Sequence, residues 1–222
     1  MDKELKDSIL KTGTLTLGIV CKDGIVLAAD IKQSYGSGGG VSYIAGKGKK
    51  IIEINDQIVV TTAGTASDTR KVANVLRAEL RLKELKSRST PNIKQAASLL
   101  SNMLYQNIRN LSMFPSIAHF LLAGYDDEGV HLFNANPDGY LEEADDYSVT
   151  GSGLYQAHPI LDAEYKKNIT VEEGIKLAVK CIKASMGRDP GVGEGIDVYV
   201  IKEGEIKSVL AKDFVTELKD RQ

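Results

Sequence analysis

The chain has little cysteine and almost no net charge, and each shortage removes a class of function. Its 222 residues include only two cysteines, Cys21 and Cys181, which are far apart and have no metal-ligand spacing. We therefore expect buried free thiols in a reducing compartment rather than a disulfide scaffold. The 28 basic and 30 acidic residues are interspersed and sum to −2. This balance offers no basic surface for nucleic acid or for an anionic membrane.

Long apolar runs, histidine clusters and phosphate-loop motifs are also missing. No segment is long enough to span a membrane, and residues 1–13 lack the apolar core of a secretory signal. We therefore expect a cytoplasmic protein whose first 13 residues are either a disordered tail or a removable propeptide. The three histidines, His119, His131 and His158, have no metal-site spacing. The glycine-rich stretch 35–40 does not lead into GKS or GKT. We expect neither metal nor cofactor.

Residue patterns predict strands in three blocks and helices between them. Runs of β-branched and apolar residues, bounded by turns such as Asp23-Gly24, mark the strands, and the glycine-rich stretch is expected to interrupt them. The predicted strands are residues 14–21, 24–30, 49–54, 57–62, 118–123, 130–134, 147–150, 196–202 and 206–210.

Apolar residues at helical spacing predict the helices. Thr170 and Glu173 form a capping box at the start of one of them. The first predicted helix follows Ala63-Gly64 and is stopped by Ser89-Thr90-Pro91, and the second starts near Pro91 and includes residues 96–108. Residues 157–163 lie in a further run, another helix extends from 170 to about 185, and residues 213–222 form a polar helical tail. This segregated order favours an α+β fold with two antiparallel sheets between helical layers. With no repeat or linker found, we expect a single domain over residues 14–222.

The dipeptide Gly13-Thr14 carries the most specific chemical signal. It lies where the polar leader meets the first predicted strand. Cleavage of its peptide bond would create a threonine with a hydroxyl and a free α-amine, which titrates at about pH 8. Such a residue holds a nucleophile and a general base together.

Several segments follow this dipeptide in a specific order. They are TGTLTLGIVCKDGIVLAAD from residue 12, KKIIEI from 49, TTAGTASD from 61, GSG at 151–153, and RD at 188–189 followed by GEGIDV at 193–198. Together they resemble the proteasome β-type subunits, especially the archaeal ones, within the N-terminal-nucleophile hydrolase superfamily. The resemblance covers roughly residues 13–210 and implies the four-layer αββα sandwich of that superfamily.

The resemblance also implies roles for individual residues. Thr14 matches the nucleophile, which the subunit frees by cutting Gly13-Thr14 itself. Lys50 matches the lysine that lowers the pKa of the amine and stabilises the developing alkoxide. Asp30 matches the acid that orients Lys50 and keeps it charged.

Further matched positions would complete the site. Gly64 matches the backbone N–H that stabilises the oxyanion, and Ser152 and Asp189 match residues that hydrogen-bond around the new amine. Ser34 and Ala66 would hold the substrate backbone as an extended strand. The positions expected to shape the substrate pocket are Gln33, Gly48, Ile52, Thr62, Ala66 and Arg70. We expect this pocket to prefer apolar or neutral side chains, with some tolerance of acidic ones through Arg70.

The sequence departs from the family pattern in three places. Val192 stands where a serine is common, so the amine loses one potential hydrogen-bond partner. Residues 37–40 are additional, and unless they bulge outward Lys47 or Lys49 could compete with Lys50. Leu15 replaces a frequent threonine, with little expected effect.

The resemblance implies a ring assembly and leaves other functions open. The expected partners are α-type subunits and other β-type subunits in heptameric rings, stacked four deep into a 28-subunit core, with an ATPase that feeds in unfolded polypeptides. The main alternative is a noncatalytic β-type subunit that serves assembly. A bacterial-type threonine protease of the two-ring kind and an α-type subunit fit the sequence less well.

Overall fold

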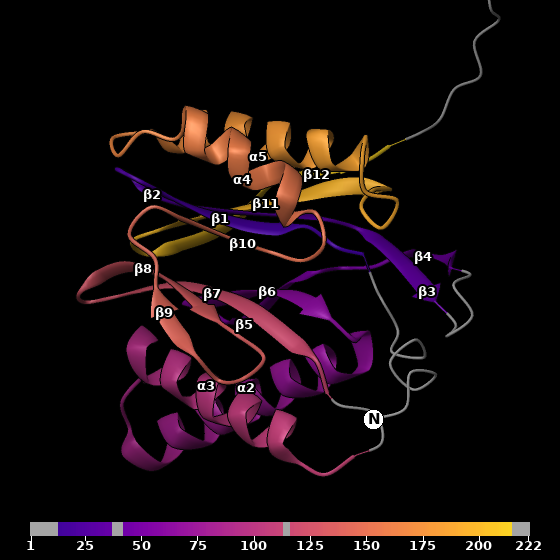
Figure 1. Ribbon diagram of the computed structural model, residues 1–222. Coiled ribbons are helices and arrows are strands. Elements are labelled where there is room, and N and C mark those ends of the chain that lie inside the picture. Colours follow the sequence, from indigo (N-terminus) through magenta and orange to yellow (C-terminus); the bar gives the residue numbers. More distant parts are fainter. Residues whose placement is uncertain (1–12, 37–41, 113–115, 215–222) are drawn as a thin grey trace, which may run out of the picture.

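Two antiparallel five-stranded sheets lie face to face, and two helices cover the outer side of each (Figure 1). This computed structural model describes residues 13–36, 42–112 and 116–214. The first sheet has the order β10-β1-β2-β11-β12, formed by Tyr147–Thr150, Thr16–Cys21, Gly24–Asp30, Gly195–Lys202 and Glu205–Asp213. The second has the order β5-β6-β7-β8-β9, formed by Ile51–Asn55, Ile58–Gly64, Ala118–Asp126, Gly129–Ala135 and Leu141–Glu143.

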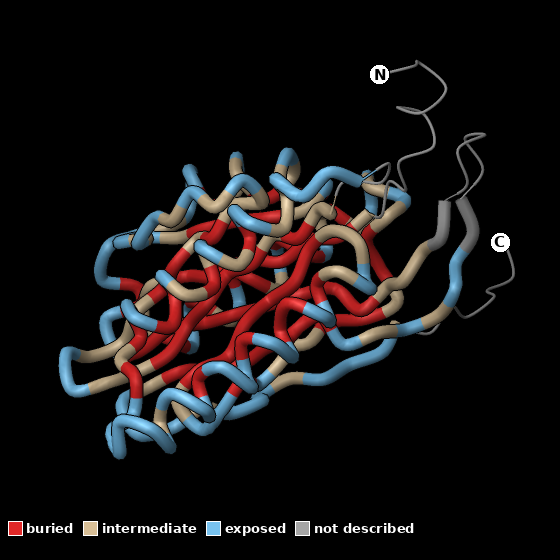
Figure 2. The backbone as a smooth tube through the Cα atoms, turned by 90° about the horizontal axis from the view of Figure 1, so that it is seen from below, coloured by how far each residue is buried: buried red, intermediate tan, exposed pale blue. Residues whose placement is uncertain are grey.

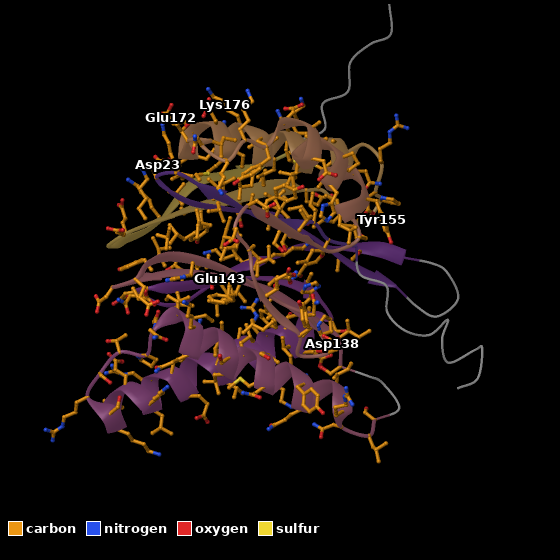
Figure 3. The ribbon with its side chains drawn as sticks, turned by 60° about the vertical axis from the view of Figure 1, so that its left-hand side comes forward. Asp23, Asp138, Glu143, Tyr155, Glu172 and Lys176 are labelled. Carbon is orange, nitrogen blue, oxygen red and sulfur yellow. The ribbon has the colours of Figure 1, made fainter. Side chains whose placement is uncertain are left out.

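The helices form the two outer layers. The pair α2 (Ala66–Ser87) and α3 (Ile93–Arg109) packs on the second sheet, and α4 (Leu154–Glu164) and α5 (Val171–Met186) pack on the first. Their solvent-facing sides are polar, as Glu172 and Lys176 on α5 illustrate (Figure 3). The expected αββα sandwich is therefore confirmed.

Strand alternation produces three layers of apolar core. In β2, Val26 and Ala28 face α4 and α5, whereas Ile25, Leu27 and Ala29 face the second sheet. The second sheet divides its residues in the same way, with one face toward the other sheet and one toward α2 and α3. Because both faces of both sheets are covered, the buried backbone runs through the middle of the molecule (Figure 2).

The capping box and the cysteines behave as the sequence predicts. The Thr170 hydroxyl accepts a hydrogen bond from the Glu173 N–H, and the Glu173 carboxylate accepts one from the Thr170 N–H. Cys21 and Cys181 are buried free thiols. No helix in the described ranges is long and apolar enough to cross a membrane.

Three predictions of local structure were wrong or incomplete. The glycine-rich region contains an unpredicted two-stranded sheet, β3 (Lys32–Gly36) with β4 (Ser42–Lys47). Its Lys, Ser and Gly residues have low strand propensity, and backbone pairing decides the structure instead. The short strand β9 was also missed. Asp213 ends β12 rather than opening a helix. The rest of the predicted tail, residues 215–222, lies outside the described residues, as do the leader residues 1–12 and the additional residues 37–40.

Candidate active site

A pocket of about 190 Å³ opens beside Thr14, where strands of both sheets end near the start of α2. Six of the seven predicted substrate residues line this pocket: Gln33, Ser34, Ile52, Thr62, Ala66 and Arg70. The seventh, Gly48, lies beneath Gln33, since a Cβ added at Gly48 would come within 1.9 Å of the Gln33 Nε2. Gly13, Thr14, Lys50 and Gly64 also line the pocket. The structure thus brings residues from distant parts of the sequence around one cavity.

Asp30 is the buried centre of this region. It is fully buried at the end of β2, and its Oδ1 lies 2.7 Å from the Nζ of Lys50. The same oxygen accepts a hydrogen bond from the N–H of Leu15 at 2.9 Å. Its Oδ2 accepts from the N–H groups of Lys32 and Gly193 at 3.2 and 3.0 Å. Four donors use the acceptor capacity of the carboxylate, so its position is fixed from all sides.

Burial shifts the ionisation of Lys50. Its removal from water lowers the pKa of the ammonium, while the charges and hydrogen bond of Asp30 and the charge of Asp189 oppose that shift. The lowered pKa brings Lys50 closer to exchanging a proton than a surface lysine would be.

Lys50, and neither of its lysine neighbours, pairs with Asp30. The Lys50 carbonyl accepts hydrogen bonds from the N–H and the hydroxyl of Thr62, at 2.8 and 3.3 Å. This pairing with β6 fixes the register at the start of β5. Lys47 instead forms an exposed ion pair with Asp213, and the side chain of Lys49 is exposed.

The backbone of Thr14 is connected to a serine and an acid from the other end of the chain. The N–H of Thr14 donates to the Oγ of Ser152 at 3.1 Å, and that hydroxyl donates to the Oδ2 of Asp189 at 2.5 Å. The carbonyl of Thr14 accepts from the N–H of Gly153 at 3.1 Å. After cleavage of Gly13-Thr14 the same nitrogen would be the free amine. Ser152 and Asp189 are therefore placed where they can hold it.

The residue before Thr14 makes an unusually close backbone contact. A Cβ added at Gly13 would lie 2.1 Å from the Cα of Gly191, and one added at Gly191 would lie 2.2 Å from the Cα of Gly13. No pair of side-chain-bearing residues could approach this closely. The Asp189–Gly193 loop thus packs directly against Gly13, the residue before Thr14.

Gly64 ends β6 at the wall of the pocket. Its φ of +116° is a conformation that other residues rarely adopt, and an added Cβ would lie 2.2 Å from the carbonyl oxygen of Ile117. Gly64 thus lines the pocket at a position where the backbone conformation and the nearby Ile117 carbonyl disfavour any side chain.

Val192 belongs to the core rather than to the polar site. It is 3% exposed and packs in the apolar cluster beneath α4 and α5 that also contains Leu15. A serine hydroxyl at this position would stand among apolar side chains.

Sequence reasoning missed Lys32 and Gly191. Lys32 lines the pocket, and its Nζ donates to the Pro190 carbonyl at 2.6 Å, which connects β3 to the Asp189–Gly193 loop. The position of Lys32 between Asp30 and Gln33, both assigned to the site, was the available signal. Gly191 had no signal beyond its presence in a glycine-rich turn. None of the three histidines lines the pocket, and the described residues contain no cluster of three or more potential metal ligands.

Comparison with known proteins identifies the family. The family model described as "Proteasome subunit" matches residues 10–201. A proteasome subunit beta of Methanopyrus kandleri is 36% identical over 97% of this chain and 99% of its own length. The corresponding protein of Ferroglobus placidus is 36% identical over 90% of this chain and 91% of its own. The "Proteasome subunit beta 2" of Thermofilum pendens is 39% identical over 86% and 90%. The chain belongs to the proteasome subunit family, and its β-type relatives support a β-type role.

Proposed function

We propose that the chain is a threonine-type endopeptidase of a proteasome core, made as a precursor and activated by its own cleavage of Gly13-Thr14. Residues 1–13 are then a propeptide, and residues 14–222 the catalytic domain. The observation that carries the proposal is the hydrogen-bond chain from the Thr14 N–H through Ser152 to Asp189. The buried Asp30–Lys50 pair lies at the same pocket.

Activation proceeds by transfer of the Gly13 acyl group from the backbone nitrogen of Thr14 to its hydroxyl oxygen. The Thr14 hydroxyl oxygen attacks the Gly13 carbonyl carbon, and the Gly13-Thr14 C–N bond breaks. The hydroxyl proton passes to the departing nitrogen, which becomes the α-amine, and an ester links Gly13 to the Thr14 oxygen. Water hydrolyses this ester and releases the leader with a C-terminal carboxylate.

In peptide hydrolysis, Thr14 with its free α-amine repeats this attack on the carbonyl of each substrate. The Thr14 oxygen attacks the substrate carbonyl, and the α-amine accepts the hydroxyl proton and passes it to the leaving amine. Lys50 stabilises the alkoxide, and Asp30 holds Lys50 in place. The N–H of Gly64 stabilises the oxyanion, a donor typically worth about 3–4 kcal/mol. Water completes the turnover by hydrolysing the ester.

The family relationship favours an assembled setting for this chemistry. In the proposed assembly the chain forms heptameric β-type rings, stacks with α-type rings into a 28-subunit cytoplasmic core, and receives unfolded polypeptides from an ATPase. The site then faces an enclosed chamber.

The decisive experiment is intact-mass measurement with N-terminal sequencing after co-assembly with an α-type partner. Wild-type chain should begin at Thr14, and a Thr14→Ala control should keep Gly13 and residues before it. Retention of the leader by wild-type chain in complete rings contradicts self-activation.

The second candidate is a noncatalytic β-type subunit that supports assembly. The burial of Val192 in the apolar core, where a hydrogen-bonding serine is common, favours it. Its signature is assembled rings that keep the leader and cleave no peptide.

A further inference from the structure

The pocket beside Thr14 carries charge of only one sign. Its lining contains four cationic side chains, Lys32, Lys49, Lys50 and Arg70, and no carboxylate among the described residues. A concave site lined by one sign of charge concentrates ligand groups of the opposite sign. The pocket is therefore polarised toward an anionic substrate side chain.

The four cationic side chains differ in the ion pairs and hydrogen bonds that they make within the protein. Lys50 is paired with Asp30, and the Lys32 Nζ donates to the Pro190 carbonyl. Lys49 is exposed and makes no direct ion pair within the described chain, although its charge acts on the carboxyl of Asp197. Arg70 is exposed and has neither an ion pair nor a hydrogen bond to any described residue. Arg70 is thus the cation with the most unused hydrogen-bonding capacity.

The position of Arg70 on α2 suits contact with a substrate side chain. Ala66 lies one helical turn before Arg70 on the same face, and both line the pocket. The small side chain of Ala66 leaves space through which a longer substrate side chain can extend. A guanidinium presents a planar set of donors that matches a carboxylate in two parallel hydrogen bonds. Ile52 and Ala66 supply apolar surface for the methylene groups of such a side chain.

We propose that this pocket selects a glutamate or aspartate at the residue whose carbonyl Thr14 attacks, with Arg70 as the group that binds the carboxylate. The inference rests on the proposed peptidase function and specifies its substrate class. The sequence analysis expected the pocket to prefer apolar or neutral side chains. The proposal differs because the sequence did not show that Lys32, Lys49 and Arg70 line the same pocket.

The test compares two peptides that differ only in charge. Co-assembled particles whose chains begin at Thr14 are assayed with fluorogenic peptides identical except for Glu or Gln before the scissile bond. We expect kcat/KM to be about tenfold higher for the Glu peptide, as for a charge-assisted hydrogen bond. Arg70→Gln should bring the Glu-to-Gln ratio close to one, because the Glu peptide loses its charged partner. Lys71→Gln is the matched control, because Lys71 is exposed on α2 next to Arg70 and does not line the pocket.

The outcomes separate this inference from the function on which it rests. A Glu-to-Gln ratio near one in wild type, or a high ratio that Arg70→Gln leaves unchanged, overturns the role of Arg70 while the particles still cleave peptides. A third peptide with Leu before the scissile bond is assayed beside them, and its preferred cleavage by wild type would likewise overturn the selection of an acidic side chain. Particles that begin at Thr14 but cleave none of the peptides overturn the peptidase function and the inference together.

Discussion

The Oδ1 of Asp30 accepts hydrogen bonds both from the ammonium of Lys50 and from the N–H of Leu15, at 2.7 and 2.9 Å. One oxygen atom therefore holds the lysine of the site and fixes the residue next to Thr14. The position of Lys50 relative to the proposed nucleophile depends on this shared acceptor more than on the flexible lysine side chain.

Replacing Asp30 should cost both stability and activity. Asp30→Asn leaves the ammonium of Lys50, a residue that is 7% exposed, without its carboxylate. Breaking a buried ion pair from one side typically costs about 3–5 kcal/mol. We expect a loss of this size in the free energy of unfolding, measured by denaturant titration, and no leader removal in assembled particles. The double variant Asp30→Asn/Lys50→Met should regain much of the stability and remain unprocessed. Normal processing by either variant would contradict the proposed role of the pair.

Adding a methyl group at Gly191 should slow activation and spare the mature enzyme. The new Cβ would lie 2.2 Å from the Cα of Gly13 and would displace the bond to be cut. Misplacement of reacting groups by about 1 Å can cost about 100-fold in rate. Mass spectrometry should show slow leader loss by Gly191→Ala, while a chain produced to begin at Thr14 should cleave peptides at the wild-type rate, because Gly13 is gone.

Gly193→Ala provides the matched control for this experiment. It makes the same change two residues away, where the nearest atom to the new Cβ is the Lys32 Cδ at 3.6 Å. Equal slowing by both variants would show that the loop is merely intolerant of substitution.

The two cysteines should make the fold less stable in alkali. Burial is the main cause that raises the pKa of both Cys21 and Cys181 to about 12, from a usual value of 9.0. Between these values the unfolded chain loses thiol protons that the folded chain retains. The free energy of unfolding must therefore fall as pH rises from about 9 to about 12. Cys181→Val should show a shallower fall over this range.

A thiol reagent gives a second readout of the same burial. We expect no reaction of folded protein at pH 8, and reaction of both thiols once denaturant unfolds the chain. Rapid labelling of native protein would contradict the buried environment.

Removing the helix cap at Thr170 should reduce the free energy of unfolding and leave peptide cleavage unchanged. The hydroxyl of Thr170 accepts the Glu173 N–H at 3.2 Å at the start of α5, and neither residue lines the pocket beside Thr14. Thr170→Ala should cost about 1 kcal/mol, within the usual range for helix caps. Thermal unfolding should detect the loss, and peptide cleavage at a temperature well below the transition should be unchanged. A selective loss of activity would indicate coupling between α5 and the site.

The sequence predicted the layers because strands and helices leave strong local patterns, whereas the candidate site residues came from the resemblance to proteasome β-type subunits. Alternation of apolar residues placed the strands that form the two main sheets, and the order of motifs identified residues that the structure brings to one cavity. Thr14, Ser152 and Asp189, for example, are connected by hydrogen bonds across 138 and 37 residues of sequence. The resemblance, and not the residue types alone, singled them out at such separations.

Features that depend on close tertiary contact were not predictable in this way. The β3–β4 ribbon is held by backbone pairing between residues of low strand propensity. The contact between Gly13 and Gly191 leaves no trace in composition or periodicity, since glycine at either position is equally consistent with a simple turn. The hydrogen bond from Lys32 to Pro190 likewise required knowledge of where the loop lies.

The carboxylate of Asp30 also links the beginning and the end of the domain, because it accepts a hydrogen bond from Leu15 near the start. It accepts a hydrogen bond from Gly193, 163 residues later in the sequence. A ribosome must therefore have made nearly the whole domain before this carboxylate can gain all four of its donors. A chain that ends before Gly193 leaves Asp30 with one donor fewer, so under the proposed function a growing or broken chain would lack the complete peptidase site.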